Sequence, residues 1–159
     1  MRAEPQKKFM HLAIREARKN IKSMDGGPFG ACIVKDGKVI SLARNTVLKN
    51  DATCHAEINA IRKASRRLKN FDLCGCVIYS TTEPCPMCFS AIHWARIDAL
   101  YYGTTIADVK KLGFNELSIP VSLMKKRGKS QLKITSKFYT PECLKLLSDW
   151  DKLENKRIY

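Results

Sequence analysis

The hydrophobic positions along the chain change their period several times, and these changes predict an alternation of helices and strands. Apolar residues recur at helical spacing in three long segments, residues 5–23, 55–69 and 141–156. Two shorter helices are expected over residues 83–95 and 108–112. Short apolar runs typical of strands cover residues 29–35, 38–45, 77–81, 99–103 and, more weakly, 131–135.

The first two strands form the clearest local unit. Asp36 and Gly37 lie between them, and Asp-Gly is a dipeptide preferred in tight hairpin turns. A leading hairpin followed by strand–helix alternation predicts an α/β fold, in which helices cover both faces of a mixed sheet. The length of 159 residues is that of one ordinary domain, so we expect a single domain over residues 1–159.

The composition narrows the class of protein. Hydrophobic residues make up 45% of the chain and charged residues 28%, which excludes a disordered or collagen-like protein. The sequence has no run of about 18 apolar residues, so we expect no membrane span. Its first residues are charged and carry no apolar signal core, and we expect a cytoplasmic location.

The chain is strongly basic, with 29 Lys and Arg against 15 Asp and Glu and a net charge of +14. Such a charge suits a nucleic-acid partner or an anionic substrate, but a solvated lysine-rich surface explains it equally. Positive residues gather on the helix expected over residues 55–69 and again at residues 125–129. Because the second cluster contains Gly128 and few apolar residues, we expect it to be a mobile loop.

Three residues have the types and spacing of zinc ligands. Cys85 and Cys88 are three apart at the predicted start of one helix, and His55 lies at the predicted start of another. A helix N-terminus favours the thiolate over the thiol, and a catalytic zinc site takes three protein ligands and keeps one position open. A structural zinc site, with a fourth ligand from Cys54, Cys74 or Cys76, and unligated core cysteines are the alternatives.

Glu57 is the expected proton carrier beside such a zinc ion. A carboxylate near a water that the metal activates can accept a proton and pass it to a leaving group. Residues two apart on an ideal helix point about 200° apart, so His55 and Glu57 can face one metal only if His55 lies at an irregular helix entry. The pattern H-x-E followed by P-C-x-x-C, which includes Pro84, is typical of zinc nucleobase deaminases.

With these motifs the sequence resembles the cytidine-deaminase-like zinc enzymes, and within them the bacterial guanine deaminases and related plant guanosine deaminases. The matching segments are Gly26-Gly27-Pro28-Phe29-Gly30-Ala31, Val34-Lys35-Asp36-Gly37, His55-Ala56-Glu57, Ala60-Ile61-Arg62-Lys63-Ala64, Glu83-Pro84-Cys85-Pro86-Met87-Cys88, Ala91-Ile92-His93-Trp94-Ala95-Arg96, Gly113-Phe114 and the aromatic Tyr159. The resemblance implies a three-layer α/β/α sandwich around a five-stranded mixed sheet. It also implies a homodimer whose subunits exchange the segment that begins near residue 115.

The resemblance assigns a role to each matching residue. His55, Cys85 and Cys88 would bind Zn²⁺, and Glu57 would carry the proton from the attacking water to the ring and to the leaving amine. Asn45 would bond the polar edge of the base, and the backbone N–H of Ala56 would hold a substrate oxygen.

Aromatic residues would complete the implied pocket. Phe29 and Trp94 would stack on the flat ring, although core packing would also explain both, and Tyr159 would close the pocket. The implied reaction is the hydrolysis of guanine to xanthine and ammonia, a step of purine metabolism with a small-molecule substrate.

One departure from the pattern leaves the substrate open. Guanine deaminases carry two acidic residues after Gly-Phe, whereas Asn115 and Glu116 follow Gly113-Phe114 in this sequence. Glu116 would still bind the base, or the enzyme would prefer cytosine or a related ring. Deamination of adenosine in tRNA is the third alternative, favoured by the basic charge. A non-catalytic zinc-stabilised binding module is the fourth, and Glu57 argues against it.

Overall fold

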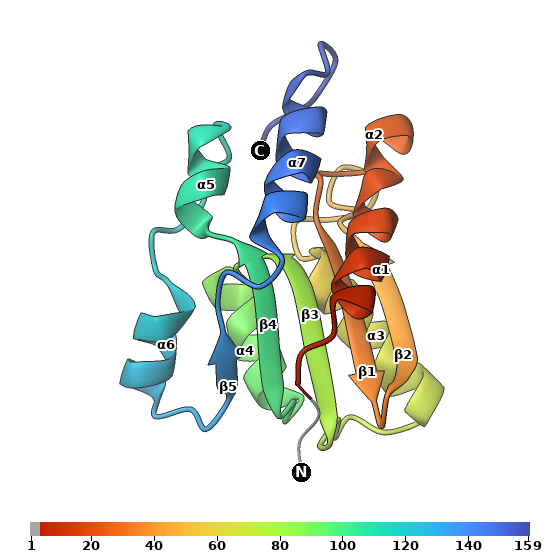
Figure 1. Ribbon diagram of the computed structural model, residues 1–159, viewed down its shortest axis with the longest axis vertical. Coiled ribbons are helices and arrows are strands. Elements are labelled where there is room, and N and C mark those ends of the chain that lie inside the picture. Colours follow the sequence, from red (N-terminus) through yellow and green to blue (C-terminus); the bar gives the residue numbers. More distant parts are fainter. Residues whose placement is uncertain (1–3) are drawn as a thin grey trace.

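The computed structural model describes residues 4–159, and Figure 1 shows their arrangement. The elements in chain order are α1 (Lys7–Arg18), α2 (Asn20–Ser23), β1 (Gly30–Lys35), β2 (Lys38–Arg44), α3 (Ala56–Leu68), β3 (Cys76–Thr82), α4 (Pro86–Trp94), β4 (Ala99–Thr104), α5 (Ile106–Lys111), α6 (Val121–Gly128), β5 (Lys133–Thr135) and α7 (Thr140–Asp151).

The strands form one five-stranded mixed sheet in the order β2-β1-β3-β4-β5. Strand β1 pairs antiparallel with β2 and with β3, whereas β3, β4 and β5 run parallel. The turn between β1 and β2 has positive φ at both Asp36 and Gly37, 49° and 71°, as a type I′ hairpin turn requires. The predicted hairpin and the predicted mixed sheet are therefore confirmed.

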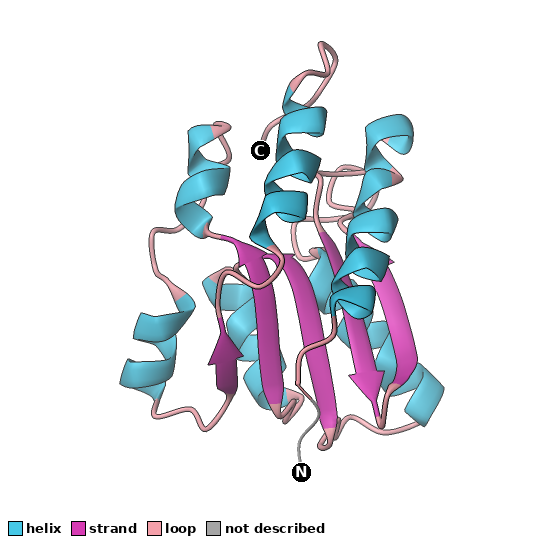
Figure 2. Ribbon diagram, viewed as in Figure 1, coloured by secondary structure: helices cyan, strands magenta, loops and turns pink. Residues whose placement is uncertain are grey.

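Helices cover both faces of the sheet, as Figure 2 shows. Successive residues of β1 point to opposite faces: Ala31 and Ile33 pack with α3, α4 and α6, while Cys32 and Val34 pack with α1 and α7. The two apolar clusters thus make the three-layer α/β/α sandwich that the sequence predicted.

The structure differs from the predicted elements at three places. The helix expected over residues 5–23 is divided at Lys19 into α1 and α2. The predicted mobile loop at residues 125–129 is wrong, because residues up to Gly128 belong to α6, which buries Val121 against the sheet. Helix α7 ends at Asp151 instead of continuing to residue 156, and the chain beyond it turns back toward Phe114 and Phe29.

The directions of the strands determine which edge of the sheet can carry a binding site. The parallel strands β3 and β4 end at the same edge as β2, and helices α3 and α4 begin there. Ligands of open α/β sheets bind at the carboxyl ends of parallel strands. Within residues 4–159, no helix combines the length and apolar character needed to cross a bilayer.

Candidate metal centre and substrate pocket

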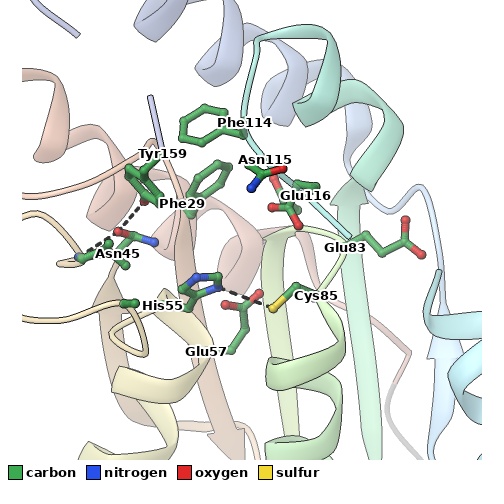
Figure 3. A pocket seen from close by; sticks show the side chains of 13 residues that line it. Phe29, Asn45, His55, Glu57, Glu83, Cys85, Phe114, Asn115, Glu116 and Tyr159 are labelled. Carbon is green, nitrogen blue, oxygen red and sulfur yellow. Dashed lines mark hydrogen bonds between the residues drawn. The ribbon is translucent and has the colours of Figure 1, made fainter. Parts of the chain in front are cut away.

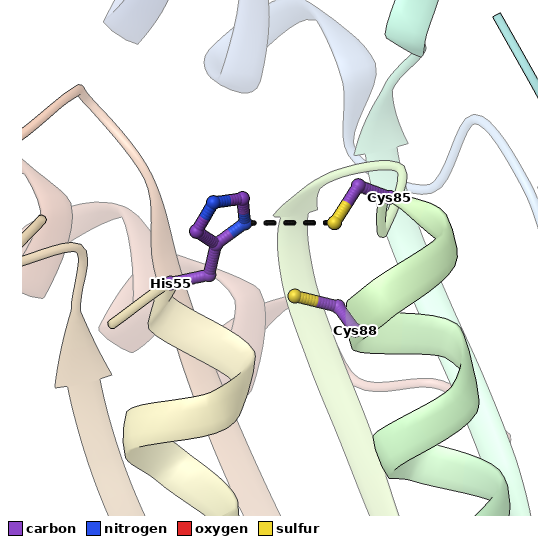
Figure 4. Close-up of side chains that lie close together, drawn as sticks. All are labelled: His55, Cys85 and Cys88. Carbon is purple, nitrogen blue, oxygen red and sulfur yellow. Dashed lines mark hydrogen bonds between the residues drawn. The ribbon is translucent and has the colours of Figure 1, made fainter. Parts of the chain in front are cut away.

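The three predicted zinc ligands lie at two neighbouring helix starts (Figure 4). His55 is the N-cap residue of α3 and Cys85 that of α4, and both have extended backbone, with ψ near 158° and 168°. Pro86 follows in the first turn of α4, where its missing N–H has no helical partner, and Cys88 projects from the same turn. The irregular helix entry that the sequence argument required at His55 is confirmed.

The geometry of these side chains fits a tetrahedral zinc ion. Nδ1 of His55 lies 3.6 Å from Sγ of Cys85, and the three ligand atoms all lie within 4.8 Å of one another. Zinc–sulfur and zinc–nitrogen bonds of about 2.3 and 2.0–2.1 Å place neighbouring ligand atoms about 3.6 Å apart in a tetrahedron. Two thiolates and an imidazole are the donors that zinc prefers, so the residues fit this metal.

The thiols of Cys85 and Cys88 have pKa values that are shifted in opposite directions. Contact with the Cys88 thiol, together with His55, lowers the pKa of Cys85 to about 4. The same contact with Cys85, together with burial, raises the pKa of Cys88 well above its usual value. Cys85 is therefore a thiolate at neutral pH, and a metal ion that binds both sulfurs displaces the proton of Cys88.

Glu57 lies one residue inside α3 and faces the same space as His55 (Figure 3). Its side chain is buried; Oε1 accepts a 2.8 Å hydrogen bond from Ser80 Oγ, and Oε2 accepts one of 3.4 Å from Cys88 Sγ. Burial raises the pKa of Glu57. A carboxyl group whose pKa lies closer to neutrality can both accept and release a proton during a reaction.

A cavity of about 340 Å³ opens above these residues. Its volume is at the lower end of the range for small-molecule sites. Phe29 and Phe114 form an aromatic wall, with ring centroids 5.2 Å apart and planes at 65°. The lining residues are Phe29, Asn45, Val47, Ala52, His55, Glu57, Thr82, Glu83, Cys85, Phe114, Asn115, Glu116 and Tyr159. The size and the aromatic side chains suit a small, flat heterocycle.

Asn45 presents a hydrogen-bond donor to this cavity. Its Oδ1 accepts hydrogen bonds from the backbone N–H of Val47, at 3.0 Å, and from the hydroxyl of Tyr159, at 2.8 Å. The Tyr159 hydroxyl also accepts one from the N–H of Gly27, at 3.0 Å, and burial raises its pKa to about 12. With Oδ1 held on the Tyr159 side, the amide nitrogen of Asn45 faces the cavity in Figure 3.

Glu116 supplies an acceptor on the opposite wall. Figure 3 shows its carboxyl group beside Asn115 and across the cavity from Asn45. Burial raises the pKa of Glu116 to about 7, and the negative charge of Cys85 adds to the effect. The cavity thus offers a donor on one side and a titratable acceptor on the other.

Most of the predicted site residues lie together, but Trp94 does not. Trp94 is at the end of α4, 76% exposed and not among the residues that line the cavity, so its stacking on the ring stays a prediction. Phe114 lines the cavity beside Phe29. Ala56 is fully buried as the first residue of α3, where the backbone N–H has no intrahelical acceptor.

Several residues that line the cavity or contact Glu57 were not among the predicted site residues. Phe114 and Asn115 had a signal, because both lie in or beside the Gly113-Phe114 motif. Ser80 and Glu83 had a weaker one, since Ser80 lies in a buried strand and Glu83 was part of a motif without an assigned role. Their contacts join segments far apart in the chain, which local patterns do not reveal.

Comparison with known proteins shows which enzymes this chain is similar to. The model of the cytidine and deoxycytidylate deaminase zinc-binding region matches residues 3–104. The chain is 39% identical to a guanine deaminase of Bacillus subtilis over 155 residues, which covers 95% of this chain and 97% of that protein. It is 40% identical to a tRNA-specific adenosine deaminase of Buchnera aphidicola over 131 residues, 82% of each protein. The structure of a guanine deaminase from Nitrosomonas europaea superposes with a TM-score of 0.85 at 26% identity, covering 96% of this chain and 88% of that one.

Proposed function

Because the chain belongs to the cytidine and deoxycytidylate deaminase zinc-binding family, we propose that it hydrolyses free guanine to xanthine and ammonia. The observation that carries the proposal is the cavity over His55, Glu57 and Cys85, which has an aromatic wall and one polar side chain on each flank. The similarity to a guanine deaminase over nearly the whole of both chains supports the choice of substrate.

His55, Cys85 and Cys88 would hold Zn²⁺, whose Lewis acidity would activate a water molecule for attack on the ring carbon that bears the amino group. Glu57 accepts one proton of that water and delivers it to the adjacent ring nitrogen. It then carries the second proton to the departing amino group, which leaves as ammonia while the oxygen stays on the ring. Ser80 holds Oε1 of Glu57, so Oε2 is the oxygen that moves these protons.

The cavity walls match the remaining polar atoms of guanine. The amide nitrogen of Asn45 donates to a ring nitrogen or to the carbonyl oxygen, and the carboxylate of Glu116 accepts from a ring N–H. Phe29 and Phe114 exclude water from the ring faces. A buried donor or acceptor left unpaired costs about 1–3 kcal/mol, so this pairing selects among bases.

A panel of substrates tests the proposal. Ammonia release is measured from zinc-loaded protein with guanine, guanosine, cytosine, cytidine, adenine, adenosine and a tRNA anticodon stem-loop, with the Glu57→Gln protein as the blank. We expect turnover of guanine well above that of every other compound. Intact zinc without guanine turnover would overturn the proposal.

Deamination of adenosine in tRNA is the second candidate, and two observations favour it. First, tRNA-specific adenosine deaminases are up to 48% identical to this chain over the residues that align with it. Second, the exposed face of α3 carries several basic side chains. The positive residues Arg62, Lys63 and Arg66 line a second cavity beside Arg44. Turnover of the stem-loop alone, weakened steeply by added salt, would support this alternative.

We further propose that the active protein is a cytoplasmic homodimer. Trp94 and Met87 on α4 and Leu123 on neighbouring α6 are apolar and at least 37% exposed, which suits a subunit interface. All seven cysteines are free, as expected in a reducing compartment. The segment from residue 115 packs against its own chain in the described structure, and its exchange between subunits stays a prediction. Molecular mass in solution, measured for the native protein and for Trp94→Ser, tests the interface.

A further inference from the structure

Glu83 connects three parts of the active-site end of the protein. Its carboxylate accepts a hydrogen bond from the backbone N–H of Ile106 on Oε2 and another from that of Val121 on Oε1, both 3.0 Å long. Its own backbone N–H donates to the carbonyl oxygen of Thr104, at 2.8 Å. The side chain is only 7% exposed, so these bonds are shielded from water.

The two N–H groups lie at the two ends of the segment that forms one wall of the cavity. Ile106 begins α5 and Val121 begins α6. Between them lie Phe114, Asn115 and Glu116, which all line the cavity. The carboxylate of Glu83 therefore holds both ends of this wall together, while its backbone leads directly through Pro84 to the zinc ligand Cys85.

The arrangement requires a carboxylate rather than an amide. Each oxygen of Glu83 accepts from a different buried N–H, whereas a glutamine offers one oxygen and turns an NH₂ group toward the other donor. Figure 3 shows the carboxylate directed away from His55 and Glu57, so it is not aimed at the reacting atoms.

We propose that Glu83 is a positioning residue. It sets the distance between the zinc ligand Cys85 and the cavity wall that carries Phe114 and Glu116. The inference rests on the proposed function for its substrate, but the contacts themselves are independent of it. Loss of one Glu83 bond lets the wall shift relative to the metal centre. Binding of the base is then weakened more than the chemistry at Glu57.

Glu83→Gln, with Asp108→Asn as a matched control, tests this inference. Asp108 forms the capping box of α5 with Thr105, so its amide variant weakens the start of the same helix without affecting Val121. For Glu83→Gln we expect KM for guanine to rise about tenfold, with kcat changed less than threefold and zinc content unchanged. For Asp108→Asn we expect an unchanged KM. A merely destabilised protein would lose apparent kcat, since a smaller folded fraction does not alter KM.

Amide hydrogen exchange gives a readout that needs no substrate. In Glu83→Gln we expect faster exchange in residues 112–121 and unchanged exchange in α3, whereas Asp108→Asn accelerates α5 alone. If the wild type does not turn over guanine but the exchange result holds, the substrate is wrong and the positioning role stands. Loss of zinc, a fall in kcat at constant KM, or unchanged exchange in residues 112–121 would each overturn it. Should Glu83→Gln fail to fold, Glu83→Asp, which keeps both acceptors on a shorter side chain, is read by the same criteria.

Discussion

The hydroxyl of Tyr159 donates a 2.8 Å hydrogen bond to Oδ1 of Asn45, although the two residues are 114 positions apart in the chain. The backbone carbonyl of Tyr159 in turn accepts a hydrogen bond from the N–H of Asn115, at 3.1 Å. The tyrosine thus bridges the two flanks of the cavity. It also orients the amide of Asn45, so that a donor and not an acceptor faces the substrate.

Tyr159→Phe is expected to weaken substrate binding without altering the chemistry. The ring still packs edge-on against Phe114, but the Asn45 amide is free to rotate once the hydroxyl is gone. One neutral hydrogen bond is worth about 0.5–1.5 kcal/mol, so KM for guanine should rise about 2–10-fold while kcat is nearly constant. Steady-state kinetics checks this, with Tyr101→Phe, which lies outside the cavity lining, as the control. Equal KM values in both variants would contradict the bridge.

Glu57→Gln is expected to keep the fold and the zinc while losing most of the activity. The amide fills the same buried space and can still bond Ser80, but it cannot accept and release a proton. General acid–base groups contribute about 10²–10⁴-fold to rate, and kcat should fall within that range. Ammonia release and zinc content by atomic emission are measured together. Glu142→Gln on α7 is the control, and a Glu57→Gln protein as active as this control would refute the proton-carrier role.

Removal of one thiolate is expected to release zinc and lower stability. A zinc ion bound by His55, Cys85 and Cys88 would join the starts of α3 and α4. A ligand present at about 100 times its dissociation constant adds about 2.7 kcal/mol to stability, so the loss of zinc should lower Tm by several degrees. Zinc content and Tm are compared for Cys85→Ala and for Cys143→Ala, which removes a buried cysteine outside the site. Full zinc occupancy in Cys85→Ala would contradict the ligand set.

Glu116→Gln is expected to affect stability and binding in opposite directions. Burial raises the pKa of Glu116 from 4.5 to about 7, so the fold favours the protonated carboxyl. The stability that this preference contributes is complete below pH 4.5 and is lost as the pH rises through 7. The neutral glutamine should therefore raise Tm relative to wild type at pH 8 and have little effect at pH 4.5.

The same substitution removes the charged acceptor for the base, so KM for guanine should rise at pH 8. In the wild type, KM should rise as the pH falls through 7, because protonation removes that acceptor. Glu154→Gln, at an exposed position, serves as the control for both measurements. A Tm difference independent of pH would show that the Glu116 carboxyl is not buried as described.

The sequence by itself determined the elements whose signals are local. The period of apolar residues predicted β1 to β4 and α3, because burial on one face imposes that period on any helix or strand. The turn at Asp36 and Gly37 was readable because few residues tolerate two successive positive φ angles. His55, Cys85 and Cys88 were readable because zinc accepts few types of side chain. Glu57 was readable because its carboxyl group follows His55 by two residues.

Only the tertiary structure decided how the cavity is walled. The basic residues 125–129 contain too few apolar positions to predict a helix from the sequence. Helix α6 nevertheless forms, because Val121 is buried and its N–H donates a hydrogen bond to Glu83. Trp94 matched a motif but faces solvent in the chain, while Phe114 and Tyr159 reach the cavity from a loop and from the segment after α7. These contacts join residues distant in sequence, and their energy depends on burial and bond geometry that exist only once the chain has folded.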